Sequence, residues 1–244
     1  MKKLAFNRKE LNTIFNQSYQ GKTVNIFVSY SSLNGDLAGK IKYFLEKYGL
    51  SVFLAHEDIR PTADWQKEII KNLKACDIFL PLLTSKFRES EWTDQEIGMA
   101  IILDKLVLPA KASRNPHGFI GLRQACNFDY RDVKQSCRKI IRVIREHNSF
   151  RQPLSDCLIR TLETSRDFDG ARDILIELKE IENFAKKQLD QILRISIKNN
   201  QVRMCTEGQD FLKAIVKKYA SELDPILLDV YERVKDTFQS PVST

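Results

Sequence analysis

The 244-residue sequence lacks an apolar run long enough to cross a membrane. Its most apolar stretch lies in the uncharged run 78–85, which is eight residues long, whereas a spanning helix needs ~20 residues. Residues 1–10 carry four basic side chains with no apolar segment behind them, so we expect no secretory signal peptide. With 43% hydrophobic residues, the chain can bury a substantial core, which argues against disorder.

Metal-binding and nucleotide-binding motifs are also missing. The five cysteines form no Cys-x-x-Cys pair, and His56, His117 and His147 are isolated from one another. This scatter argues against a metal site and a disulfide framework and favours a reducing, cytoplasmic location. No Gly-x-x-x-x-Gly-Lys-Ser/Thr phosphate loop occurs.

Charge is unevenly distributed along the chain. Residues 1–150 hold 24 Lys and Arg against 16 Asp and Glu, a net +8, and residues 151–244 hold 15 against 16, a net −1. A basic excess favours an anionic partner, namely nucleic acid, an anionic membrane or a phosphorylated ligand, although a solvated basic surface explains it equally well. Arg138, Arg142 and Arg145 share a helix face without interleaved aromatic residues, so nucleic acid is the least favoured partner.

Strand-like and helix-like segments alternate from residue 24 to residue 147. The expected strands are 24–30, 50–54, 78–83, 106–108 and 126–128, and the expected helices are 36–48, 64–74, 92–103 and 133–147. Such alternation predicts an α/β fold, here a flavodoxin-like five-stranded parallel sheet of strand order 2-1-3-4-5. Pro81 lies inside the third strand and cannot donate to the ladder, so we expect local irregularity there.

From Pro153 onward the pattern becomes helical. We expect helices at 154–165, 170–198, 209–220 and 225–238, with a break near Asn183 left open. The apolar stripe from Ile174 to Ile195 must pack on its own neighbours or on a second protomer. The expected organisation is an N-terminal extension (1–22), an α/β domain (23–148) and a helical domain (153–239) for oligomerisation or sensing.

Candidate site residues follow the first and third strands, between which a doubly wound sheet binds its ligand. The first loop begins with Ser29, Tyr30 and Ser31, which can offer hydroxyl and N–H groups to phosphate. Trp92 and Glu96 are four residues apart and share a helix face. A phosphoacceptor receiver domain is disfavoured because Thr84 stands where its carboxylate is needed. A flavin carrier is only loosely suggested by the hydroxyl-rich first loop.

The sequence also resembles a TIR (Toll/interleukin-1 receptor) domain of the prokaryotic kind. The resemblance covers residues 22–148 and rests on four motifs in order: FVSYS at 27–31, GLSVFL at 49–54, EDIRP at 57–61 ahead of Trp65, and SEWTDQEI at 90–97. One departure occurs after the second strand, where Pro61 is followed by Thr62 instead of the family's frequent Gly.

The resemblance implies two possible functions. Some TIR proteins cleave the nicotinamide–ribose bond of NAD+, which is then substrate and not cofactor, and some of these make a cyclic ADP-ribose signal in prokaryotic antiviral defence. Others are non-catalytic scaffolds that assemble with partner TIR domains. The catalytic glutamate carries over to Glu96. The implied substrate-binding residues are Ser29, Tyr30, Ser31, Asp58, Arg60, Trp65 and Trp92, with Asp58 and Arg60 in the loop 55–63.

TIR enzymes tend to work as assemblies, and we expect self-association through the TIR domain, the helical domain or both. A near-neutral helical domain beside a TIR half of net +8 suggests that the helical part brings like-charged protomers together.

Overall fold

The computed structural model describes residues 6–15, 19–55 and 64–237. The chain divides into two compact units, one of which is made of two segments that are distant in sequence. Thr23–Phe150 form one, here called the sheet unit, whereas Met1–Lys22 join Arg151–Thr244 in the other, the helical unit. No helix of the described residues combines the length and the apolar character needed to cross a membrane.

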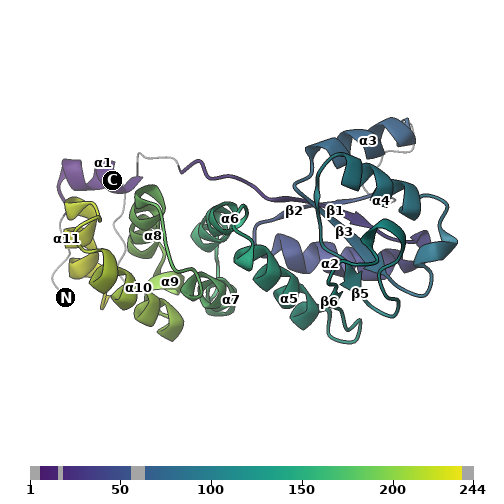
Figure 1. The fold of residues 1–244 in the computed structure, drawn as a ribbon. Coiled ribbons are helices and arrows are strands. Elements are labelled where there is room, and N and C mark those ends of the chain that lie inside the picture. Colours follow the sequence, from purple (N-terminus) through teal and green to yellow (C-terminus); the bar gives the residue numbers. More distant parts are fainter. Residues whose placement is uncertain (1–5, 16–18, 56–63, 238–244) are drawn as a thin grey trace. The chain divides into compact units, whose positions relative to one another are not determined.

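The sheet unit is built on a parallel sheet of strand order β2-β1-β3-β5-β6, with β4 also beside β3 (Figure 1). The strands are β1 (Asn25–Ser29), β2 (Ser51–Leu54), β3 (Ile78–Leu83), β4 (Leu106–Val107), β5 (Ala110–Lys111) and β6 (Cys126–Asn127). All their pairings are parallel. The predicted fold is confirmed. β4 lies within the fourth strand expected at 106–108, and β5 continues that strand beyond the expected bounds.

The fourth strand is divided opposite Pro81. Phe79 pairs with Val107 and Leu82 pairs with Ala110, so the register is the same on both sides of the break. Pro81 and Pro109 are the prolines at this point of the two strands, and neither has an N–H group for the ladder. The irregularity expected inside the third strand is not found there, since β3 is continuous and fully buried. The interruption falls instead on the neighbouring strand, between β4 and β5.

Two pairs of helices cover the sheet. Helices α2 (Gly35–Glu46) and α5 (Val133–Glu146) pack together on one face, and α3 (Trp65–Ala75) and α4 (Thr93–Ile102) cover the other (Figure 1). Under α3 and α4, the rings of Phe27 and Phe79 stack with centroids 5.7 Å apart within a buried cluster that includes Leu73 and Ile97. This core fixes α4 over the strands whose ends carry the candidate site.

The helical unit contains seven helices among its described residues. They are α1 (Arg8–Phe15), α6 (Arg151–Glu163), α7 (Phe168–Lys179), α8 (Lys186–Lys198), α9 (Asn200–Met204), α10 (Thr206–Tyr219) and α11 (Pro225–Val234). The segment expected at 170–198 forms two helices, α7 and α8. They are separated around Asn183, where the sequence pattern allows a break. Residues of α8 are buried on all sides, as expected for a helix surrounded by others.

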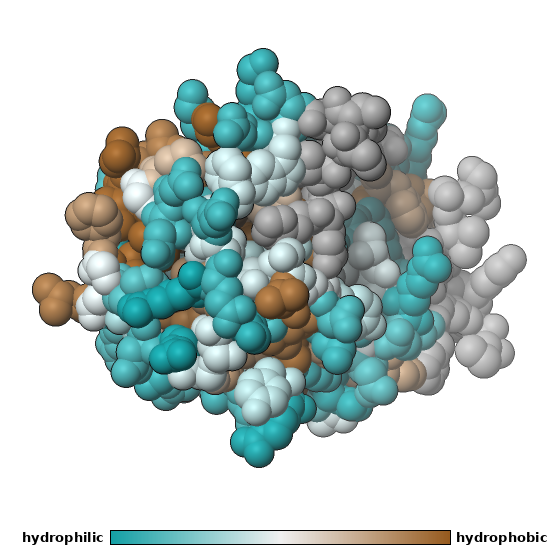
Figure 2. All heavy atoms as spheres, turned by 90° about the vertical axis from the view of Figure 1, so that its right-hand side faces the viewer, coloured by the Kyte–Doolittle hydropathy of each residue, from teal (hydrophilic) through white to brown (hydrophobic). Residues whose placement is uncertain are grey.

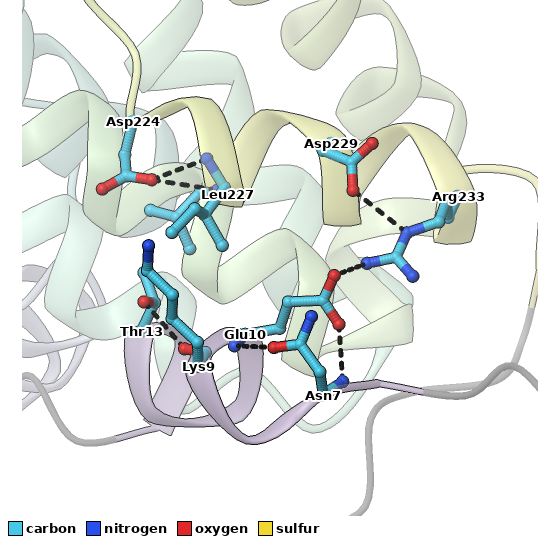
Figure 3. Close-up of polar contacts among 9 residues, drawn as sticks. Asn7, Lys9, Glu10, Thr13, Asp224, Leu227, Asp229 and Arg233 are labelled. Atoms are coloured by element: carbon cyan, nitrogen blue, oxygen red, sulfur yellow. Dashed lines mark hydrogen bonds and ion pairs between the residues drawn. The ribbon is translucent and has the colours of Figure 1, made fainter.

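The first helix, α1, docks on α11 through charged side chains (Figure 3). Asn7 and Glu10 form a reciprocal capping box, in which each side chain accepts a hydrogen bond from the other's backbone N–H at 3.0 and 2.7 Å. The second carboxylate oxygen of Glu10 lies 2.5 Å from Arg233, which also pairs with Asp229 at 3.3 Å. Asp224 caps α11 by accepting from the N–H of Leu227.

A second N-terminal segment, residues 19–22, is bound to α6. The carboxylate of Asp156 accepts hydrogen bonds from the Tyr19 hydroxyl and from the Lys22 N–H, the latter at 2.8 Å. Arg160 donates to the carbonyl oxygen of Gly21 at 2.6 Å. Gly21 is packed so closely that an added Cβ would lie 2.6 Å from that of Asp156. Residues 19–22 therefore belong to the helical unit by specific contacts.

This division corrects the charge contrast drawn from the sequence. The sheet unit holds 19 Lys and Arg against 15 Asp and Glu, a net +4, and the helical unit holds 20 against 17, a net +3. Five of the basic residues counted with the first half belong to Met1–Lys22. The two units carry similar charge, so charge gives no reason to assign assembly to one of them.

Candidate active site

The candidate site lies where β1 ends. Ser29 is the last residue of β1, and Tyr30 and Ser31 follow it. All three side chains are buried. The chain then forms a short 3-10 helix, Ser32–Asn34, that leads directly into α2.

Glu96 reaches the end of β1 from the first turn of α4. Its side chain is 1% exposed, and the Ser29 hydroxyl donates a hydrogen bond to its Oε2 at 2.5 Å. Thr93 holds the start of the helix in place by donating to the carbonyl oxygen of Phe87 at 2.9 Å. The structure thus brings together two candidate residues that are 67 positions apart in sequence.

Burial gives this carboxyl group unusual acid–base behaviour. Desolvation raises the pKa of Glu96 to about 7, and the hydrogen bond from Ser29 acts in the opposite direction. Among the described residues, none donates a hydrogen bond to the other buried oxygen of Glu96, Oε1. The site therefore holds a carboxyl group that changes charge near neutral pH, and its Oε1 can accept a hydrogen bond from a ligand.

Trp65 and Trp92 form an aromatic pair beside these elements. Trp92 immediately precedes α4, and Trp65 is the first residue of α3. Their rings meet edge to face, with centroids 4.3 Å apart and an angle of 81° between the planes. Both side chains are partly exposed, so part of each ring remains open to a ligand.

Two polar contacts join segments that follow different strands, and neither is predicted by the sequence. The Thr84 hydroxyl, just after β3, donates to Oδ1 of Asn34, in the loop after β1, at 2.8 Å. His117, in the segment after β5, lies 2.9 Å from the Asp94 carboxylate in the first turn of α4. These contacts fix the loops around Ser29 and Glu96 relative to one another.

Two of the predicted substrate-binding residues, Asp58 and Arg60, lie outside the described residues, as does the loop 55–63 except for Ala55. Within the described ranges, no three His, Cys, Asp or Glu side chains are grouped so that they could hold a metal ion.

The domain is thus of the doubly wound α/β class, with a buried glutamate at the point where the strand order reverses. Comparison with known proteins gives its family. Residues 26–154, more than half of the chain, match the family described as TIR domain, so the chain belongs to the TIR domain family. None of the curated proteins matches it. Among solved structures, it is similar to the TIR domain of the Toll-related receptor TRR-2 from Hydra magnipapillata. That likeness has 14% identity and a TM-score of 0.43, and covers 50% of this chain and 98% of the receptor domain.

Proposed function

We propose that this TIR protein cleaves the bond between nicotinamide and ribose in NAD+. The observation that carries the proposal is the buried Ser29–Glu96 pair at the sheet's switch point, where Glu96 has a pKa of about 7 and an acceptor oxygen without a hydrogen bond from any described residue. Buried groups with perturbed pKa values are concentrated at functional sites.

The reaction places specific demands on such a site. Nicotinamide carries a positive charge in NAD+ and leaves as a neutral molecule, so its departure needs no general acid. As the bond to nicotinamide breaks, positive charge develops on the ribose, as in the oxocarbenium-like transition state of glycoside hydrolysis. A preorganised carboxylate in a dry site stabilises this charge more strongly than water does.

The residues at the site fit these demands. Oε1 of Glu96 is the oxygen left to accept a hydrogen bond from a ribose hydroxyl, while Ser29 holds the other oxygen. Ser31 and Tyr30 follow Ser29 on the loop that we assign to the pyrophosphate. The open parts of Trp65 and Trp92 offer a flat surface to the nicotinamide ring.

Release of free nicotinamide from NAD+ by the purified full chain tests the proposal. We expect Glu96→Gln, which keeps the size but not the charge, to slow release by at least about a hundredfold. Glu91→Gln is the matched control, because Glu91 is exposed in the same stretch of sequence, and its rate should be unchanged. Absence of release from dilute and concentrated protein alike would refute the proposal. Mass spectrometry of the product distinguishes linear from cyclic ADP-ribose.

A non-catalytic scaffold is the second candidate, since TIR domains bind other TIR domains. The observation that favours it is the exposure of large apolar side chains on the sheet unit: Phe119 is 83% and Leu122 105% exposed. On the face drawn in Figure 2, hydrophobic residues gather in separate groups among hydrophilic ones. A scaffold should bind its partner equally well with Glu96→Gln, whereas Phe119→Ser with Leu122→Ser should weaken the complex.

A further inference from the structure

A cavity of about 380 Å³ opens between α10 and α11 in the helical unit. Its size falls within the range of small-molecule sites, about 300–1,000 Å³. The cavity lies outside the TIR match, which ends at residue 154, and shares no lining residue with the Ser29–Glu96 site.

Two lysines on one wall are its main source of charge. Lys213 and Lys217 are four residues apart on α10 and both line the cavity. Within the described parts of the chain, neither ammonium group has an ion-pair or hydrogen-bond partner. Like charges at this spacing repel each other along a helix, so an anion between them would remove a repulsion as well as add an attraction.

The opposite wall adds a third cation and two carboxylates. Lys235 pairs with Glu232 at 2.5 Å, so these two charges largely cancel. Asp236 is the remaining anionic group of the lining. The lining therefore has a net positive charge, because the two charges of Lys213 and Lys217 are opposed only by that of Asp236.

A buried cation near the cavity strengthens this excess. Arg203 is 1% exposed, and it donates to the main-chain carbonyl oxygens of Ser196 and Thr237, which carry no net charge. Its positive charge acts on Tyr231, a lining residue that is itself 5% exposed, and opposes the larger effect of the Glu232 and Asp236 carboxylates on the same hydroxyl. Burial raises the pKa of Tyr231 to about 12, so its hydroxyl stays protonated and can donate a hydrogen bond.

We infer that the α10–α11 cavity binds a small molecule that carries two or more phosphate groups. The two ammonium groups of Lys213 and Lys217 and the phenol hydroxyl of Tyr231 are donors suited to several phosphate oxygens at once. A monoanion would engage only part of this donor set. The inference is independent of NAD+ cleavage, because it concerns other residues and its test measures binding.

Isothermal titration of the full chain with inorganic pyrophosphate, at low salt, tests the inference. We expect binding at a site separate from the Ser31 loop, and at least about tenfold weaker binding at that site in the double variant Lys213→Ala, Lys217→Ala, because each change removes a charge-assisted contact. Lys67→Ala with Lys71→Ala is the matched control. These two lysines have the same spacing, but they lie on α3 and form ion pairs with Asp64 and Glu68. The control should bind as the unchanged protein does. Tyr231→Phe should weaken binding by about threefold.

Three outcomes would overturn the inference. The first is no binding up to millimolar pyrophosphate. The second is equal binding by both double variants. The third is binding that survives the Lys213 and Lys217 changes but is lost in Ser31→Ala, which would assign the anion to the sheet unit. Both lysines of the α10 pair are exposed, so the double variant should keep its fold, and circular dichroism checks this.

Discussion

Removal of the Ser29 hydroxyl gives the sharpest perturbation of the candidate site. With a pKa of about 7, Glu96 is ionised in about half of the molecules at pH 7. If only the carboxylate supports cleavage, kcat/KM should rise with pH through a limb centred near pH 7 and level off above it. The hydrogen bond from Ser29 lowers the pKa of Glu96, so Ser29→Ala should move that limb to higher pH.

The size of the shift follows from the strength of the lost bond. A hydrogen bond to a charged group contributes about 1.5 kcal/mol, which corresponds to about one pKa unit. About a tenth of the variant would then be ionised at pH 7, instead of about half, so its rate should fall about fivefold. At pH 9 both proteins are almost fully ionised, and the rates should nearly agree.

The assay is nicotinamide release between pH 5.5 and 9.5, measured as kcat/KM so that the free enzyme is reported. Ser32→Ala is the matched control, because Ser32 lies in the same loop but is exposed; its profile should not move. A loss of equal size at pH 7 and pH 9 would refute the reasoning, since it would show that Ser29 does not act through the ionisation of Glu96.

Further measurements address stability and loop position. Because the folded-state pKa of Glu96 is raised from 4.5 to about 7, ionisation of this buried group lowers stability progressively as pH rises from 4.5 to 7, and the loss is constant above 7. Glu96→Gln should therefore stabilise the chain by about 3 kcal/mol at pH 9, a gain that vanishes below pH 4.5 in denaturant titrations. Thr84→Val should release the loop held by Asn34 and raise KM, with recovery in Thr84→Ser; an unchanged KM would remove the loop contact from the mechanism. Gly21→Ala should destabilise by about 1–3 kcal/mol through its clash with Asp156, whereas Gly98→Ala, with open space around it, should stabilise slightly; equal melting temperatures would contradict the packing.

The sheet was predictable because its central strands, β1 and β3, are buried on both faces and therefore appear as short apolar runs. β3 is the clearest case, since all of its residues are buried. Pro81 alone indicated an irregularity in this part of the sheet. That the fourth strand is the one divided depends on Pro109, which lies opposite Pro81 in the folded sheet. That register is a property of the folded sheet and not of either segment alone.

Helix α1 was missed, although a local signal was present. Asn7 and Glu10 stand at capping-box spacing, but the helix has only eight residues, too few to be stable in isolation. Its contact with α11 through Arg233 stabilises it, and that contact joins residues more than two hundred positions apart. A segment that depends on such a partner cannot be identified from its own pattern.

For the candidate site, sequence spacing placed Trp92 and Glu96 near the same helix start. It did not predict the bond between Ser29 and Glu96, the edge-to-face contact of Trp65 with Trp92, or the contact between Thr84 and Asn34. Each of these joins different strands or helices, so it exists only once the sheet has set the distance between them.

The energetics of Glu96 separate the two candidate functions. A helix start is stabilised by negative charge, but Asp94 already supplies that charge from an exposed position in the same turn. Glu96 is buried instead, where its ionised form is destabilised. An apolar residue there would serve a scaffold better, because it would pack without this cost. A carboxyl group kept in a dry site with one oxygen left to accept a bond is suited to positive charge that appears only during a reaction. If Glu96→Gln raises stability and abolishes cleavage together, the same burial accounts for both effects.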